Sequence, residues 1–291
     1  MKIYSPTQTD VFSFCPQARQ FYKEGWAPRI ADKPMIASWM GVAMGAGLEG
    51  YYTDKASPYV EKGLKAWEGS VETFRKAGGT IEESDLLGIP ELLTRALTKY
   101  PKMDPIPPTW TVLGVEQAFP EYGNARMDLT VRLESGKISA VDFKWKKALY
   151  VKSGEGIAQA RGRTLMEYEN YWNMLHYVWT LKKVYGVGAA NEYYIILGEL
   201  SPGAHVTMQK FMVDPKVLTQ WERSAKMLWN EMEAEDEEAA QLDGLSLPPR
   251  GNTTHRNQYG LCKYYDACFT HFLDRESMRL KYVQIERSSS R

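Results

Sequence analysis

Hydrophobic and polar positions divide the chain into a helical first part and a later part in which short apolar runs predict strands. From Ile36 to Tyr100 the apolar residues recur at helical spacing, and Ser57-Pro58 and Gly78-Gly79 interrupt this pattern. The proline-containing segment Pro101–Pro108 follows directly. We therefore predict a helix-rich stretch over residues 36–100 that is closed by a linker.

Beyond the linker, the pattern alternates between strand-like and helix-like segments. Glu134-Ser135-Gly136-Lys137 lies between two apolar runs and predicts a hairpin turn. Helical spacing predicts one helix over 157–184 and an amphipathic helix over 216–240. Strands are predicted at 110–119, 125–133, 137–145, 191–199 and 205–213. This order of elements predicts an α/β fold.

Composition bounds the class of protein. The chain has 291 residues, of which 44% are hydrophobic and 25% charged, and this suffices for one large domain with a helical insertion. No apolar run is long enough to predict a membrane span, and Met1-Lys2-Ile3-Tyr4 does not lead into the apolar region of a signal peptide. We expect a soluble cytoplasmic protein with no membrane partner.

The charge balance limits how the chain could bind nucleic acid. Its formal net charge is zero, so a nucleic-acid partner requires a local basic patch. Trp145 lies inside the most basic stretch and offers a ring for stacking on a base, although a tryptophan at a strand end more often caps a core. The cationic residues of this stretch are Lys144, Lys146, Lys147, Lys152, Arg161 and Arg163.

Charged residues interrupt the first three predicted strands. Glu116, Asp128 and Asp142 each lie in or beside an apolar run, where an unpaired charge is costly. Lys144 follows Asp142 by two residues, so both side chains point to the same face of the strand. Carboxylate oxygens suit Mg²⁺ or Mn²⁺, which polarises a phosphate and lowers the pKa of a bound water. An ammonium group beside them would stabilise developing negative charge.

The order Glu116, Asp128, Asp142-Phe143-Lys144 resembles the PD-(D/E)XK nuclease superfamily, and most of all its RecB-type exonuclease branch. That branch includes the CRISPR-adaptation exonucleases and many phage-encoded recombination nucleases. The resemblance implies a restriction-endonuclease-like central mixed β-sheet flanked by helices. It further implies that Asp128 and Asp142 bind Mg²⁺ or Mn²⁺, that Glu116 shares in the site, and that the main-chain carbonyl of Phe143 completes it. Lys144 would be the electrostatic catalyst.

Both ends of the chain add to the resemblance. Iron–sulfur members of the branch join one N-terminal cysteine to three near the C-terminus around a [4Fe-4S] cluster. This chain has Cys15, Cys262 and Cys268, and His255 lies near the place of the missing cysteine. Three interpretations stay open: an Fe–S cluster on these four residues, a zinc ion on the same set, or a clasp that holds no metal. Each predicts an N-/C-terminal cysteine clasp.

One helix departs from the family pattern. Residues 41–49 resemble the family's G-x-x-x-H-x-x-L-E helix, whose histidine helps to ligate the catalytic metal, but residue 45 is glycine. Glu49 lies one helical turn later and is a minor candidate for the site. We interpret the small residues of this helix as a surface for close packing against the sheet. They are Gly41, Ala43, Gly45 and Ala46.

A second helix carries candidate substrate-binding residues. Asn173 and Tyr177 stand where the family usually has Q-x-x-x-Y, a pair that lies beside the scissile strand. For Tyr177 a core position is an equally good interpretation, because aromatic residues recur through this helix. Lys146 and Lys147 are further candidates for contacts with the substrate.

These observations predict one nuclease domain over residues 1–291. Its parts are an N-terminal clasp (1–35), a helical region (36–108), a catalytic α/β core (109–215) and a C-terminal helix with the second half of the clasp (216–291).

The function expected from the resemblance is metal-dependent hydrolysis of DNA. We expect an exonuclease that acts on single-stranded or duplex DNA ends in recombination, repair or phage DNA processing, in a bacterial or phage-infected cell. The sequence has no phosphate-binding loop, so ATP-driven activity would belong to a recombination or helicase partner. Two alternatives stay open. One is a catalytically inactive DNA-binding or assembly protein, suggested by the missing histidine and cysteine, and the other is a structure-specific endonuclease.

Overall fold

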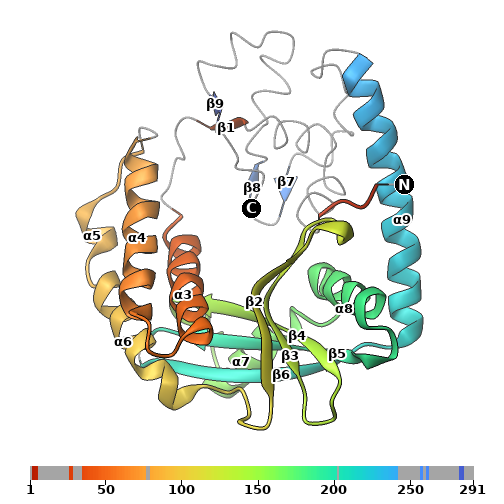
Figure 1. The fold of residues 1–291 in the computed structure, drawn as a ribbon. Coiled ribbons are helices and arrows are strands. Elements are labelled where there is room, and N and C mark those ends of the chain that lie inside the picture. The colour runs from red at the N-terminus through yellow and green to blue at the C-terminus, as the bar shows by residue number, and fades with distance from the viewer. Residues whose placement is uncertain are drawn as a thin grey trace.

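The computed structural model describes residues 2–5, 26–28, 35–76, 79–201 and 203–241, together with the strand segments 256–257, 260–261 and 282–284. Over these residues the protein has a central β-sheet with helices on both sides (Figure 1). The candidate clasp residues Cys15, His255, Cys262 and Cys268 lie outside the described residues, so the interpretations of the cysteines stay predictions.

The central sheet has the strand order β2-β3-β4-β5-β6. Strands β2, β3 and β4 are antiparallel neighbours, β4 and β5 are parallel, and β6 is antiparallel to β5. A mixed sheet flanked by helices was predicted, and this prediction is confirmed. The strands are β2 (Thr111–Phe119), β3 (Ala125–Arg132), β4 (Ile138–Lys146), β5 (Ala189–Glu199) and β6 (His205–Met212).

The predicted hairpin turn joins β3 to β4. The N–H of Gly136 donates to the carbonyl of Leu133 at 2.9 Å. Gly136 has a φ of 78°, a left-handed conformation that glycine adopts without a steric penalty. The turn therefore fixes the register in which β3 and β4 pair.

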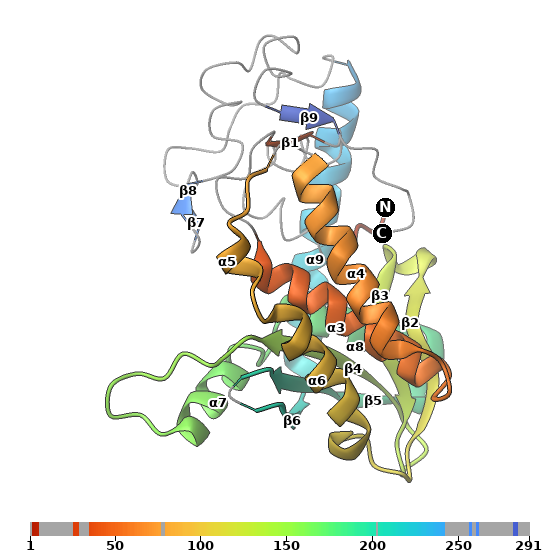
Figure 2. The same ribbon diagram turned by 90° about the vertical axis from the view of Figure 1, so that its left-hand side faces the viewer.

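A layer of helices covers one side of the sheet (Figure 2). The apolar faces of these helices form a core cluster that also contacts Phe143 and Trp145 of β4. The predicted breaks at 57–58 and 78–79 separate the helices, but the predicted linker begins too early, because Pro101 lies in the last turn of a helix. The buried side chains of Leu97 and Tyr100 hold that turn in place. The helices are α3 (Ile36–Thr53), α4 (Tyr59–Lys76), α5 (Glu83–Leu86) and α6 (Ile89–Met103).

Close packing within this layer depends on glycines of α3 and α4. A Cβ on Gly47 would lie 2.6 Å from Leu97 Cδ2, and one on Gly63 would lie 2.9 Å from the carbonyl oxygen of Ala43. The helix backbones approach each other where these side chains are absent. The small residues of α3 were predicted to pack against the sheet, but the close contacts of Ala43 and Gly47 are with the helices α4 and α6.

The prediction of one helix over 157–184 is wrong, because the segment forms α7 (Ile157–Met166) and α8 (Trp172–Tyr185). Asn170 has a φ of 54°, which no helix interior accommodates. The buried hydroxyl of Tyr193 accepts a hydrogen bond from the N–H of Asn170 at 3.0 Å and donates one to the carbonyl of Tyr168 at 2.6 Å. This side chain of β5 thus stabilises the turn between α7 and α8.

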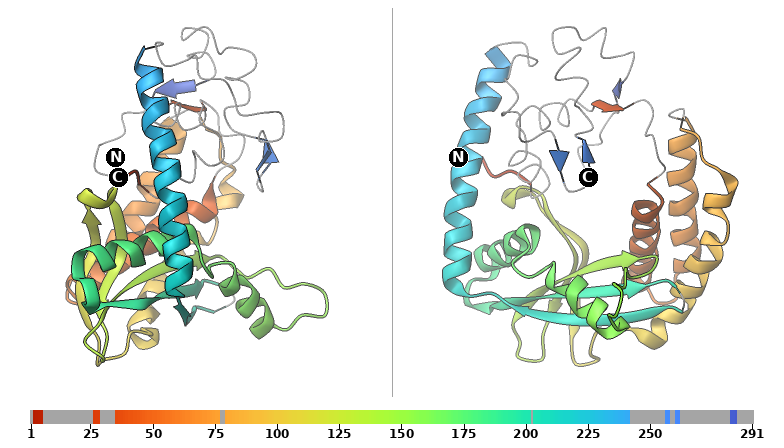
Figure 3. Two further views of the ribbon diagram at one scale, coloured as in Figure 1. Left: turned by 90° about the vertical axis from the view of Figure 1, so that its right-hand side faces the viewer. Right: turned by 180° about the vertical axis from the view of Figure 1, so that it is seen from behind.

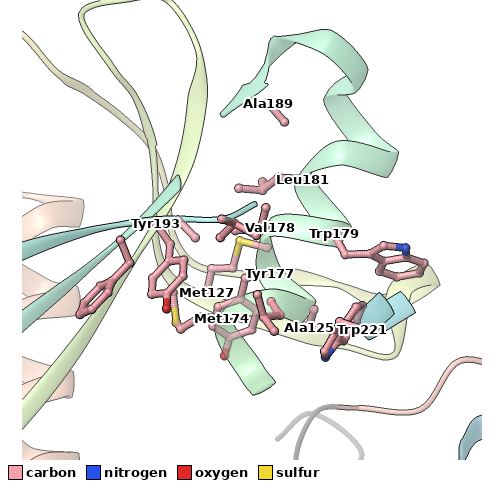
Figure 4. Packing of buried hydrophobic residues seen from close by; sticks show 14 of the residues in the cluster. Ala125, Met127, Met174, Tyr177, Val178, Trp179, Leu181, Ala189, Tyr193 and Trp221 are labelled. Atoms are coloured by element: carbon pink, nitrogen blue, oxygen red, sulfur yellow. The ribbon is translucent and has the colours of Figure 1, made fainter. Parts of the chain in front are cut away.

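On the side of the sheet opposite α4 and α6, α8 packs between the sheet and the long helix α9 (Pro215–Gln241) (Figure 3). Met174 and Val178 of α8 and Met127 and Tyr193 of the sheet belong to the buried cluster between this helix and the sheet (Figure 4). No helix in the described ranges is long and apolar enough to cross a membrane.

The remaining described elements are short. The 3-10 turns η1 (Pro120–Tyr122) and η2 (Gly186–Gly188) follow β2 and α8. Strand β1 (Trp26–Pro28) pairs antiparallel with β9 (Tyr282–Gln284), so segments from the two ends of the chain lie side by side. Strands β7 (Arg256–Asn257) and β8 (Gly260–Leu261) form a separate pair.

Candidate active site

The candidate site lies where the central sheet forks. Strands β3 and β4 are paired from the Arg132–Ile138 pair to the Leu129–Val141 pair, which is the last pair between them. Strand β3 continues its pairing with β2 as far as Ala125, whereas β4 continues beside β5 as far as Lys146. The two strands therefore separate at the residues that follow the last pair, and a cleft opens between them.

Asp128 and Asp142 occupy this fork. Each is the next residue beyond the Leu129–Val141 pair, so their carboxylates stand on the two diverging strands at the point of separation. Asp128 Oδ2 accepts a hydrogen bond from the N–H of Phe143 at 2.7 Å, which replaces the backbone pairing that β4 has lost. The sequence placed both residues in strands, and the structure brings them together as predicted.

Burial and mutual repulsion control the ionisation of Asp128. Burial raises the pKa of the Asp128 carboxyl well above its ordinary range, and the negative charge of Asp142 raises it further. The hydrogen bond from Phe143 and the charge of Lys144 oppose this shift without cancelling it. An added positive charge at the fork would relieve the repulsion between the two carboxylates.

Lys144 supplies positive charge on the same face of β4. Its Nζ lies 2.6 Å from the buried Oδ2 of Asp142, and the two side chains form an ion pair. Burial lowers the pKa of the Lys144 ammonium, but the charge of Asp142, its hydrogen bond with Lys144 and the charge of Asp128 together more than offset that effect, and the pKa lies above its ordinary value. Lys144 is therefore fully protonated at neutral pH.

Glu116 is the third carboxylate at the fork. The flanking pairs Val115–Leu129 and Gln117–Met127 place it opposite Asp128. Its φ of 48° is unusual for a residue with a side chain and marks local strain of the kind found at functional sites. Burial raises the pKa of Glu116, although the Arg126 guanidinium, 2.6 Å from Glu116 Oε2, lowers it. This pairing was not predicted from the sequence, because Arg126 lies in a different strand from Glu116.

Tyrosines surround Lys144 on the side of α8. The Lys144 Nζ lies 5.9 Å from the ring centroid of Tyr168 and 6.0 Å from that of Tyr171, both in the turn between α7 and α8. Such ring faces attract a cation. A single helix would have placed both rings on one helix face, and their position beside Lys144 in a turn was not predicted.

Tyr177 and Asn173 of α8 were predicted to bind the substrate, and the structure places them differently. Tyr177 is 9% exposed and belongs to the core cluster, yet Asp142, Asp128 and Glu116 all raise its pKa in addition to the effect of burial. Its ring is therefore part of the core while its hydroxyl lies in the field of the site. Asn173 is half-buried, and its role stays a prediction.

The predicted basic patch is partly neutralised. Arg161 forms an ion pair with the buried Glu199, and Arg163 pairs with Glu155 at 3.0 Å. Lys146 is half-buried and Lys147 exposed, so both stay candidates for contacts with a substrate. Trp145 packs against Gly198 and the helical core cluster, which agrees with the cap-of-core interpretation rather than with stacking on a base.

A groove with a volume of about 780 Å³ leads from the fork along α3. The carboxylates of the fork and Lys144 lie at one part of its wall, and the small residues of α3 form another part. Gly41 and Gly45 are half-buried, and a Cβ added to either would meet nothing within 4 Å. The packing role predicted for these two glycines is therefore wrong, because their open side faces the groove. The residues of α3 that line the groove are Ala37, Ser38, Gly41, Val42, Gly45, Ala46 and Glu49.

The donor set of the fork fits a hard divalent cation. Within the described ranges no group of three His, Cys, Asp or Glu side chains is already arranged around a metal position. At the fork, the ion pairs of Lys144 with Asp142 and of Arg126 with Glu116 supply positive charge beside these carboxylates. The chemistry nevertheless matches, since Asp142 and Glu116 raise the pKa of the neighbouring Asp128 carboxyl, and a divalent cation with a preference for oxygen ligands stabilises carboxylates gathered in this way. Glu116, Asp128 and Asp142 are the residues that would hold it.

Comparison with known proteins agrees with this geometry. The family model of the PD-(D/E)XK nuclease superfamily matches residues 3–268. The chain belongs to this superfamily of nucleases, which typically use Mg²⁺ or Mn²⁺. No curated protein matches the chain.

Proposed function

We propose that this protein is a metal-dependent deoxyribonuclease that removes nucleotides from DNA ends and is related to the RecB-type branch of its superfamily. The observation that supports the proposal best is the fork, where the buried Asp142, the half-buried Asp128 and a protonated lysine meet at the end of a strand pair. Polar groups are rarely collected in this way for stability alone, because the burial of neighbouring like charges is unfavourable.

Each residue of the fork has a distinct role in the proposal. Asp128, Asp142 and Glu116 hold the cation, which when bound polarises the phosphate and lowers the pKa of an attacking water. The ammonium of Lys144 faces the reacting phosphate and stabilises the negative charge that develops on its oxygens. The N–H of Phe143 orients the Asp128 carboxylate by its 2.7 Å hydrogen bond. The main-chain carbonyl of Phe143 is proposed as a further ligand.

The Lys144 ammonium is positioned before the substrate binds. Its ion pair with Asp142 and the rings of Tyr168 and Tyr171 restrict where Nζ can lie. A preorganised charge contributes more to catalysis than one that must move into place during the reaction. Removal of such a group typically slows an enzyme by about 10²- to 10³-fold.

Cleavage of labelled DNA tests this proposal. End-labelled single-stranded and duplex linear DNA and a closed circle are incubated with Mn²⁺, Mg²⁺ or EDTA and with wild-type protein or Lys144→Ala. We expect label to be lost from linear DNA only when metal is present, with the circle intact and the Lys144→Ala variant slower by about 10²- to 10³-fold. Cleavage of the circle would instead indicate an endonuclease.

The ion pair between Arg126 and Glu116 favours a second candidate function. A cation on Glu116 would be redundant if Arg126 permanently supplied its counter-charge, and the protein would then bind DNA without hydrolysing it. Binding of DNA without cleavage in any metal would support this candidate and contradict the nuclease.

A further inference from the structure

A group of hydrogen-bonded tyrosines lies inside the helical layer, where the proposed reaction does not use it directly. The hydroxyl of Tyr52 in α3 donates to Asp104 Oδ1 at 2.7 Å and lies 2.8 Å from the hydroxyl of Tyr100 in α6. Because a hydroxyl has one proton, and that of Tyr52 points to Asp104, Tyr100 is the donor to Tyr52. The hydroxyl of Tyr51 donates to Asp104 Oδ2 at 3.1 Å, and the N–H of Ile106 donates to Oδ1 at 3.0 Å.

These hydrogen bonds hold the hydroxyls in one arrangement. Burial raises the pKa of Tyr52 and of Tyr100, so both remain protonated donors at physiological pH. Tyr100 is fully buried, and Tyr52 packs against the same core cluster. A buried polar network whose members are all hydrogen-bonded is rigid, because displacement of a ring would leave a polar atom without its partner. The hydroxyls therefore fix the positions of the Tyr52 and Tyr100 rings in addition to packing.

The Tyr52 ring is stacked on Phe143, the residue between Asp142 and Lys144 in β4. The two ring centroids are 6.0 Å apart, and the ring planes are inclined by 27°. Side chains alternate along a strand, so the Phe143 ring points to the face of the sheet opposite Asp142 and Lys144. Phe143 packs against the helical core cluster, whereas Lys144 lies beside Tyr168 in the turn between α7 and α8. Tyr52 thus supports the back of the strand whose front carries the candidate site.

The backbone of Phe143 links this contact to the fork. Its N–H donates to Asp128 Oδ2 at 2.7 Å. The Leu129–Val141 pair is the last between β3 and β4, so strand pairing does not fix Phe143 relative to Asp128. The placement of the Phe143 N–H then depends on what holds the rest of that residue, which on the helical side is the Tyr52 ring. A hydrogen bond to a metal-binding carboxylate determines how that carboxylate is oriented.

We infer that Tyr52 is a positioning residue for the candidate metal site. Its hydroxyl, held by Asp104 and Tyr100, fixes its ring against Phe143, and Phe143 in turn holds the Asp128 carboxylate in the orientation that binds the cation. Tyr52 contacts neither the cation nor the substrate. This inference rests on the proposed function and gives the helical region a role in it, because the affinity of the fork for metal depends on a hydrogen bond between α3 and α6.

Removal of the Tyr52 hydroxyl provides the test. Tyr52→Phe keeps the ring but removes both hydrogen bonds, and Tyr100→Phe removes only the one that Tyr100 donates. Tyr194→Phe is a matched control, because Tyr194 is a buried tyrosine whose hydroxyl donates to the Glu192 carboxylate at 2.6 Å and whose ring packs edge-on against Trp110. Each variant loses hydrogen bonding to a tyrosine hydroxyl, so each should lower the Tm by a few degrees.

Mn²⁺ binding to the DNA-free protein is measured by calorimetric titration well below the Tm of every variant. We expect Tyr52→Phe to bind Mn²⁺ about three- to tenfold more weakly than the wild type, a smaller loss than the roughly 10- to 100-fold typical of a group that hydrogen-bonds a ligand directly. Tyr100→Phe should lose less, in the same direction. Tyr194→Phe should bind Mn²⁺ as the wild type does, although its Tm is lower.

Exchange of the Phe143 amide proton, followed by NMR without metal, reports on the fork directly. The hydrogen bond to Asp128 slows this exchange, so we expect it to be faster in Tyr52→Phe than in the wild type and unchanged in Tyr194→Phe. This measurement requires neither metal nor DNA.

A double-mutant cycle tests whether Tyr52 acts through the Phe143 ring. Phe143→Leu keeps the main chain but removes the aromatic ring on which Tyr52 is stacked. In this background Tyr52→Phe should change the Mn²⁺ affinity by less than about twofold, because the two residues belong to one chain of contacts. The same loss in both backgrounds would contradict the proposed route.

The outcomes separate this inference from the proposed function. If Tyr52→Phe has a lower Tm but binds Mn²⁺ as the wild type does, Tyr52 is only structural, and the nuclease proposal is unaffected. If the wild type binds no Mn²⁺, the proposed metal site fails, and exchange of the Phe143 amide decides the inference. Faster exchange in Tyr52→Phe would then support the positioning of Phe143, and unchanged exchange would overturn it. Tyr100→Phe is judged by the same criteria if Tyr52→Phe does not fold.

Discussion

The fork and the interface between α8 and α9 both bury polar groups, but they do so in opposite ways. At the interface His176 is fully buried among Trp179, Trp221 and Trp229, with ring centroids 5.4 to 5.8 Å apart. Its Nε2 is hydrogen-bonded to the carbonyl of Tyr122 at 3.0 Å. The fork instead keeps several charged groups together. The interface keeps the buried ring of His176 neutral and has its ion pair, Lys183 with Glu222, at partly exposed side chains, whereas the fork holds charge around the buried Asp142.

This difference indicates which buried polar groups serve stability and which serve chemistry. Burial lowers the pKa of His176 to about 4, so the ring is neutral at physiological pH and behaves as part of an aromatic core. At the fork, burial and neighbouring charge make the ionised form of Asp128 unfavourable, and the fold tolerates this cost. Substitutions at the fork should therefore change activity, and substitutions at the interface should change stability.

The largest expected effect is that of Asp142→Asn. The amide keeps the size of the side chain but removes a cation ligand, so we expect the rate of DNA cleavage to fall by about 10³-fold or more. The substitution removes the repulsion with Asp128 but also the ion pair with Lys144, so the two effects oppose each other and the Tm should stay close to that of the wild type. Steady-state cleavage and thermal unfolding measured on the same preparation check both expectations. Loss of activity together with a lower Tm would place Asp142 among the structural residues.

Much of the fold and part of this site could be predicted from the sequence. The strands and the alignment of Asp142 with Lys144 follow from short-range periodicity, which local sequence records directly. The break between α7 and α8 could not be predicted, because it depends on the hydroxyl of Tyr193 in a distant strand. The pairing of Arg126 with Glu116 and the open side of Gly45 depend likewise on how separate elements meet.

The next effect in size is a loss of stability in acid that arises from His176. The unfolded chain binds a proton on this residue below about pH 6.5, whereas the folded protein binds one only below about pH 4. The contribution of His176 to the free energy of unfolding should therefore decrease as the pH falls from 6.5 to 4, by up to about 3 kcal/mol, with no further change below that range. The raised pKa of Asp128 acts in the opposite direction, because the folded protein keeps the proton on that carboxyl at a pH where the unfolded chain has lost it.

Urea unfolding at a series of pH values measures this effect. Between pH 6.5 and 4, His176→Phe should lose up to about 3 kcal/mol less of its free energy of unfolding than the wild type does, and the exposed His205→Gln provides a control that should match the wild type. An unchanged pH dependence in His176→Phe would mean that other groups cause the acid instability.

The smallest expected effect is that of Arg126→Gln. The ion pair with Glu116 is partly exposed, so it contributes at most about 1 kcal/mol. Without it, Glu116 is free to bind a cation, and the Mn²⁺ concentration for half-maximal cleavage should fall by up to about fivefold. A metal titration of the cleavage rate checks this. An increase in the required Mn²⁺ concentration would show that Arg126 instead orients Glu116 for the cation.

Calorimetric titration of Mn²⁺ into the DNA-free protein tests the central claim most directly, because it examines the fork without any assumption about the substrate. We predict saturable binding to the wild type and to Lys144→Ala, and its loss in Asp128→Asn and Asp142→Asn variants that remain folded. Equal Mn²⁺ binding by the wild type and both asparagine variants would contradict the assignment of the fork as the metal site.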